Sequence, residues 1–157
     1  MSYKLDELDT RILKELQKDA RISLVDLAEK ISSSRSVVWR RIQGMEQAGI
    51  IQKHTVILDP KLVGVGVMVI AQVKMQAHNR EALPNFIEKV KSFPEVVECH
   101  TLMGNIDFIL KVMVKDVQAY EEFFWNRLSQ IEGVREISSS IALTAVKNTT
   151  ELPIRLD

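Results

Sequence analysis

The sequence predicts an α+β protein in which a small helical domain is followed by a larger domain of strands and helices. Two observations predict this fold class. Apolar residues recur at helical spacing before residue 50, whereas β-branched runs alternate with helical segments from residue 65 onward. Asp59-Pro60 interrupts both patterns, so we expect domains at 1–54 and 65–157, joined by a linker at 55–64.

Length and composition are those of an ordinary globular protein. The chain has 157 residues, of which 46% are hydrophobic and 27% are charged, and its net charge is zero. No apolar run approaches the roughly 18 residues that span a bilayer, and the polar N-terminus lacks the apolar core of a signal peptide. Because Cys99 is the single cysteine, no internal disulfide can form. We expect a cytoplasmic protein that does not bind membranes.

Three helices are expected before residue 50, and each has its own start signal. Asp6, Ser23 and Ser34 are residue types that cap helix N-termini, and Gly49 is a residue type that ends helices. Apolar residues follow each cap at helical spacing: Leu8, Ile12, Leu13 and Leu16, then Leu27, Ala28 and Ile31, then Val38, Ile42 and Met45. The partly alternating run 50–58 that comes next predicts a strand.

The second and third helices have the features of a helix-turn-helix that reads DNA. A short turn, Ser32-Ser33-Ser34, joins them, and residues 30–54 hold five basic residues against one acidic residue. The third helix places basic side chains away from its apolar side, where they can enter a major groove. An ordinary helical hairpin in a small bundle is the alternative.

The candidate DNA-binding segment is Leu24 to Gln43. Contacts are expected from five residues in its third helix: Arg35, Ser36, Trp39, Arg40 and Arg41. Arginine can pair with a guanine edge and serine with a base or a phosphate, whereas Arg41 is expected to meet phosphate. Trp39 either packs against the second helix or contacts sugar and a thymine methyl group.

The second domain is predicted to have the order β-α-β-β-α-β of a ferredoxin-like split unit. Strands are expected at 65–75, 96–102, 108–114 and 134–146, with helices marked by apolar residues near 83–90 and 117–128. Helices in this arrangement cover one face of the sheet and leave the other face open. Because the strands are apolar on both sides, face-to-face dimerisation is favoured.

Gly104-Asn105-Ile106-Asp107 joins two of the predicted strands. It is most simply a tight hairpin turn, because glycine and asparagine tolerate positive φ. Alternatively, the turn presents backbone N–H groups and the Asp107 carboxylate to a small zwitterion, with serines 138–140 as further polar partners.

Patterns typical of catalysis are lacking in the sequence. The three histidines are isolated from one another, which makes a zinc site improbable. No Ser-His-Asp pattern, Gly-rich phosphate loop or pair of catalytic carboxylates stands out. The sequence therefore predicts a binding protein that is not an enzyme and that has no cofactor or metal.

The ordered set of these residues resembles the Lrp/AsnC family of bacterial and archaeal transcriptional regulators across about 6–154. Similar signatures are the opening Leu5, Asp6, Asp9, Ile12 and Leu13; the run Gln17 to Ser23; Leu27-Ala28; Ser34, Arg41, Glu46 and Gly49-Ile50; Leu58-Asp59-Pro60; Pro94-Glu95-Val96; Gly104 to Phe108; and Lys147 to Pro153.

The resemblance implies a winged or simple helix-turn-helix followed by a ferredoxin-like domain, often called the RAM domain. It implies a homodimer that pairs through the sheet, binds a pseudopalindromic operator and assembles into octamers or other even-numbered oligomers. It also implies a small amino-acid effector bound between dimers, at Thr101, Met103, Gly104, Asn105, Asp107 and Ser139. Asn105 replaces the aspartate usual in the family, which favours a neutral effector over lysine or arginine.

Two other functions fit the same fold. Sirohaem decarboxylases resemble this family in both domains, but they would need histidines or arginines around a tetrapyrrole cavity, and His100 is the only histidine in a predicted strand there. The other alternative is a ligand-sensing oligomer that does not bind DNA. Neither explains the basic third helix.

Overall fold

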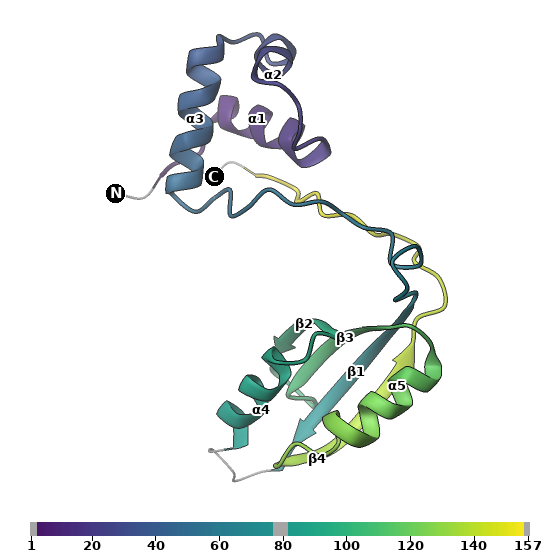
Figure 1. Cartoon of the computed structure of the whole chain (residues 1–157). Helices are drawn as coiled ribbons and strands as arrows, with labels where there is room; N and C mark the ends of the chain where they lie inside the picture. Colours follow the sequence, from purple (N-terminus) through teal and green to yellow (C-terminus); the bar gives the residue numbers. More distant parts are fainter. Residues whose placement is uncertain (1–2, 77–81, 156–157) are drawn as a thin grey trace. The chain divides into compact units, whose positions relative to one another are not determined.

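The computed structural model describes residues 3–76 and 82–155 (Figure 1). The chain forms two compact units, of which one is Met1–Ile57 with Lys147–Asp157 and the other is Leu58–Val146. Among the described residues, no helix is both long and apolar enough to cross a membrane.

The C-terminal tail is grouped with the helical unit, whereas the sequence division placed it with the domain 65–157. Two hydrogen bonds join the tail to a helix of this unit. The side-chain amide of Gln17 donates to the carbonyl oxygen of Leu152 (3.3 Å), and its oxygen accepts from the Leu152 N–H (2.7 Å). An amide side chain paired with a backbone in this way has no signature in the sequence pattern, so the periodicity could not predict it.

Three helices begin where the sequence places their caps: α1 (Glu7–Lys18), α2 (Leu24–Lys30) and α3 (Arg35–Gln47). The side chains of Asp6, Ser23 and Ser34 each accept a hydrogen bond from a backbone N–H in the first turn. α3 ends before Gly49, whose φ of 73° is a conformation that glycine adopts without strain. The three helices bury one small core: Ile12, Leu27, Ala28, Ile31, Val38 and Met45.

The strand predicted at 50–58 is wrong, because this segment has no regular secondary structure. A strand requires a neighbour to satisfy its backbone N–H and carbonyl groups, and no described segment pairs with this one. Ile50 and Ile51 pack partly buried against the helical core, whereas Val56 and Ile57 are exposed, at 74% and 72%.

The second unit has the predicted order of strands and helices, with the last strand ending at Ile141 instead of Val146. Its elements are β1 (Val67–Met75), α4 (Ala82–Lys91), β2 (Val96–Thr101), β3 (Phe108–Val114), α5 (Val117–Phe123), a π-helical turn η1 (Phe124–Leu128) and β4 (Val134–Ile141). The antiparallel sheet has the order β2-β3-β1-β4, and α4 and α5 lie on one of its faces (Figure 1). The ferredoxin-like arrangement is confirmed.

Alternation along the strands divides the sheet into a covered face and an open face. Beneath the helices, the core includes Val69, Ala71, Val73, Leu110 and Val112, together with Phe86 and Phe108, whose ring centroids are 4.5 Å apart. The intervening residues point to the other face, where Met68, Ile70, Ile109 and Met113 are partly buried. Neither α4 nor α5 covers this apolar centre (Figure 1).

Candidate functional sites

The exposed side of α3 carries four of the five expected DNA contacts. Arg35, Ser36, Trp39 and Arg40 are exposed, while Val38 on the opposite side is completely buried. Neither Arg35 nor Arg40 forms an ion pair with another residue of the described chain. Both guanidinium groups are therefore available to an external anion or base edge.

The fifth expected contact, Arg41, is held inside the helical unit. Its Nη1 is 2.8 Å from Oδ2 of Asp6 and 3.3 Å from Oδ2 of Asp9. The Asp9 side chain is fully buried, and its other oxygen accepts a hydrogen bond from the Tyr3 hydroxyl (3.1 Å). This network joins α3 to the start of α1, so the geometry favours a positioning role for Arg41 over the phosphate contact expected from the sequence.

The same network holds an acidic group in its charged form. The backbone N–H of Asp9, and then the charge of Arg41, lower the pKa of Asp6 below its ordinary value. Sequence analysis missed the positioning roles of Tyr3 and Asp9. A signal existed for Asp9, because this carboxylate lies three residues before Ile12 on the apolar side of α1.

The turn between β2 and β3 is tied to the neighbouring strand by Asp107. The Asp107 N–H donates to the carbonyl of Val73 (2.9 Å), and its Oδ2 accepts from the N–H of Met75 (2.7 Å). The turn itself is closed by the Leu102 N–H, which donates to the Asp107 carbonyl (2.8 Å). One carboxylate oxygen of Asp107 thus has a structural partner, and only Oδ1 has none among the described residues.

The structure does not bring all the expected effector residues together within one chain. Thr101 pairs with Phe108, which pairs with Val73, which pairs with Ile137. Ser139 lies on β4 two residues beyond Ile137, and its Oγ is 2.5 Å from the Tyr120 hydroxyl. Three strand spacings of about 4.8 Å separate β2 from β4 by about 14 Å, which exceeds the size of a small amino acid.

The remaining expected effector residues cluster at the turn. Met103, Gly104 and Asn105 are exposed, with Met103 completely so. Gly104 has a φ of 146°, a conformation that a side chain would strain. The turn therefore offers backbone groups to solvent directly beside Thr101.

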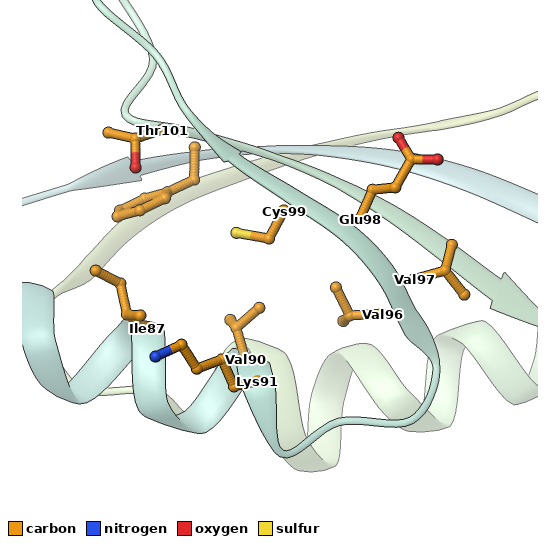
Figure 2. Close-up of a pocket in the computed structure, with 9 residues that line it drawn as sticks. Ile87, Val90, Lys91, Val96, Val97, Glu98, Cys99 and Thr101 are labelled. Carbon is orange, nitrogen blue, oxygen red and sulfur yellow. The ribbon is translucent and has the colours of Figure 1, made fainter. Parts of the chain in front are cut away.

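A cavity of about 300 Å³ lies next to this turn, between α4 and β2. Figure 2 shows Cys99 and Thr101 of β2 facing Ile87 and Val90 of α4 across it. The cavity is also lined by Lys91, Val96, Val97, Glu98 and Phe108. Burial raises the pKa of the Cys99 thiol, so at neutral pH this side chain stays uncharged. Its walls are mostly apolar, and it is open to solvent on one side, so it does not enclose a ligand as a binding pocket does.

Comparison with known proteins assigns both units. A sequence profile of winged helix-turn-helix DNA-binding domains matches residues 5–52, and one of the Lrp/AsnC ligand binding domain matches residues 68–152. The transcriptional regulator AzlB of Bacillus subtilis is 38% identical over 154 residues, which cover 98% of each chain.

Two solved structures are similar over almost the whole chain. An AsnC family transcriptional regulator from Agrobacterium tumefaciens has a TM-score of 0.90 and 41% identity, covering 95% of this chain and 97% of its own. A transcriptional regulator from Neisseria meningitidis, solved as a complex with L-Met, has a TM-score of 0.92 and 33% identity, covering 96% and 97%. The chain belongs to the Lrp/AsnC family of DNA-binding transcriptional regulators.

Proposed function

We propose that this regulator binds a pseudopalindromic operator as a homodimer, with α3 of each subunit in the major groove, and that a small amino acid changes this binding. The observation that carries the proposal is the exposed side of α3. Arg35 and Arg40 have no acidic partner in the described chain, whereas Arg41 beside them is paired internally. A helix anchored on one side and positively charged on the other suits a groove lined with phosphates.

The open face of the sheet supports the homodimer. Met68, Ile70, Ile109 and Met113 form an apolar centre that neither helix of this unit, α4 or α5, covers (Figure 1). Two such faces can bury each other around a two-fold axis. Charged side chains border the centre, among them Glu98, which accepts a hydrogen bond from Lys111 (2.7 Å). A two-fold dimer would present two α3 helices to an operator with two-fold symmetry, and further pairing would give an octamer or another even-numbered oligomer.

The effector site is proposed at the turn 101–107, completed by a second chain. The separation of Thr101 from Ser139 supports this arrangement, because one small ligand can meet both only when they come from different subunits. The ligand's ammonium group would meet Oδ1 of Asp107, and its carboxylate would meet N–H groups of the turn. Asn105 contributes no charge, so a neutral amino acid is favoured. The L-Met bound to the Neisseria regulator is consistent with an effector of this kind.

We propose action by binding, in the cytoplasm, rather than by catalysis. The similar proteins of known function are transcriptional regulators. His100, the residue on which the decarboxylase alternative depended, lies on the open face of the edge strand β2. Its Nε2 is 3.7 Å from Oε2 of Glu98, and its side chain is 64% exposed. No observation favours the decarboxylase.

The test uses the full chain and a duplex that it enriches from a random-sequence library. Arg35→Ala and Arg40→Ala should each weaken binding by about 1–3 kcal/mol, or about 5- to 150-fold, while oligomer size stays unchanged. Arg135→Ala, which removes an exposed arginine from β4, is the matched control and should bind as the parent does. Affinities within twofold of the parent for both α3 variants would contradict the proposal.

The effector is tested by calorimetry with each of the neutral amino acids. Asp107→Asn is preferable to Asp107→Ala, because its side-chain oxygen can still accept from the Met75 N–H while the charge is removed. This variant should lose the ligand response and keep ligand-free DNA binding. If Asp107→Asn binds the amino acid as the parent does, the turn is only a hairpin.

A further inference from the structure

Trp39 is a large apolar side chain on the polar side of α3. It is 54% exposed. The core of the helical unit, in which an indole could be buried, does not include Trp39. It follows Arg35 by one helical turn and precedes Arg40 directly. Its position therefore coincides with the part of α3 that is proposed to enter DNA.

The structure favours one of the two roles that the sequence left open for Trp39. It belongs neither to the buried core of the helical unit nor to the partly buried residues packed against that core. Its ring also makes no stacking or cation contact with another ring or cation in the described chain. The other tryptophan, Trp125, contacts Phe124 edge-to-face at 4.9 Å. Trp39 thus lies outside the core, with more than half of its surface exposed, and an exposed indole on the polar side of a helix indicates a contact surface.

The surroundings of Trp39 indicate what the partner is. On a helix its neighbours at i−4, i−3, i+1 and i+4 are Arg35, Ser36, Arg40 and Gln43, which are cationic or hydrogen-bonding. The only carboxylate within α3, Glu46, accepts from the Gln43 amide (2.8 Å) and lies 3.2 Å from the His54 ring. A partner for this surface must therefore be anionic around its edges and carry an apolar group at its centre.

Duplex DNA offers that combination at a single place. Phosphates line both sides of the major groove, and the thymine 5-methyl is the apolar group on its floor. We infer that Trp39 contacts a thymine methyl group in each half-site and so selects the base at that position. The inference rests on the proposed placement of α3 in the major groove and adds the identity of one base.

The spacing along α3 predicts where this thymine lies. On a helix that lies in the major groove, residues about one turn apart contact neighbouring base pairs. The thymine should therefore lie within one or two base pairs of the base that Arg35 contacts.

The experiment removes the methyl group and nothing else. The probe is the duplex that the full chain enriches from a random-sequence library, resynthesised with uracil in place of one thymine at a time. At one thymine in each half-site, the loss of one buried methyl should weaken binding of the parent about fourfold. Trp39→Ala should bind that thymine duplex and its uracil counterpart with equal affinity. A difference below about 1.5-fold counts as equal, because it corresponds to roughly a third of the free energy of burying one methyl group.

Two further variants serve as controls. Trp39→Phe keeps an aromatic face and should retain part of the preference for thymine, whereas Trp125→Ala should retain all of it. Circular dichroism and light scattering should show parental helix content and oligomer size for every variant, because Trp39 is not part of the core.

Two results would overturn the inference. In one, no uracil substitution weakens the parent. In the other, uracil weakens the parent and Trp39→Ala by the same factor, which would assign the methyl group to another residue or to DNA shape. Both leave α3 in the groove. Failure of the proposed function has a different signature, because then the parent would enrich no duplex at all.

Discussion

Replacing Arg41 should destabilise the helical unit, because a buried carboxylate would lose its cation. Arg41 joins α3 to α1 through Asp6 and Asp9, and the Asp9 side chain is completely buried. Arg41→Met keeps much of the aliphatic length of the side chain and removes the charge. The expected effect is therefore electrostatic rather than a loss of packing.

The size of the expected loss in stability depends on the interactions that Asp9 keeps when Arg41 is replaced. Removing one partner of a fully buried ion pair costs about 3–5 kcal/mol. The Arg41 side chain is 32% exposed, so solvent already screens part of the interaction. Asp9 also keeps hydrogen bonds from the Tyr3 hydroxyl and the Asp6 N–H, both at 3.1 Å. We therefore expect a loss of about 2 kcal/mol in the free energy of unfolding, which is a large part of the stability of a small domain.

Urea unfolding can report on the helical unit alone. In a Trp125→Phe background, Trp39 is the only tryptophan, so its fluorescence follows the helical unit. With an m-value of about 1–2 kcal/mol/M, the midpoint for Arg41→Met should fall by about 1–2 M. Arg40→Met is the matched control, because its guanidinium has no partner in the described chain, and its midpoint should stay at the parental value.

One outcome would refute this reasoning directly. If Arg41→Met unfolds at the parental midpoint but binds DNA as weakly as Arg40→Met, then Arg41 contacts phosphate as the sequence suggested. A lower midpoint with a parental affinity, measured well below the unfolding transition, would agree with the positioning role.

Three further predictions concern stability and assembly. Hydrogen bonds from Lys18 and Lys30 lower the pKa of Glu15 from 4.5 to about 2. The stabilisation from Glu15 is thus complete above pH 4.5 and lost as the pH falls toward 2. Glu15→Gln should make the urea midpoint depend less on pH between these two values. Gln17→Ala should raise hydrogen exchange at Leu152 several-fold, because each bond it removes is worth about 1 kcal/mol; unchanged exchange would show that the tail is held otherwise. Ile109→Lys should convert the dimer to a monomer in light scattering, and a persistent dimer would exclude the open face as the interface.

The elements of the fold were predictable because their signals are local. Asp6, Ser23 and Ser34 cap helices with their own side chains, and the β-branched, apolar runs of β1 and β3 indicate strands without knowledge of the partner strand. The prediction of a strand at 50–58 was wrong because it rested on a local signal alone. Its pattern was local, but a strand exists only when another segment supplies hydrogen bonds.

The sequence could predict a site residue only where helical or strand periodicity alone shows which way its side chain points. Arg35 and Arg40 follow from the apolar side of α3. The internal pairing of Arg41 does not, since its partner Asp9 is 32 positions earlier in the chain. The cavity between α4 and β2 likewise depends on tertiary packing, and Thr101 is the only one of its lining residues that was expected to bind an effector. No periodicity could show that Thr101 and Ser139 lie on opposite edges of the sheet.

Methylation protection of guanine N7 on an enriched duplex tests the central claim most directly, because this atom is accessible only from the major groove. The full chain should protect guanines in two half-sites whose centres are about 10.5 base pairs apart, or a multiple of that distance. Arg40→Ala should remove protection in both half-sites at concentrations where Arg135→Ala still gives it. Binding without any change in guanine N7 reactivity would contradict the placement of α3 in the major groove.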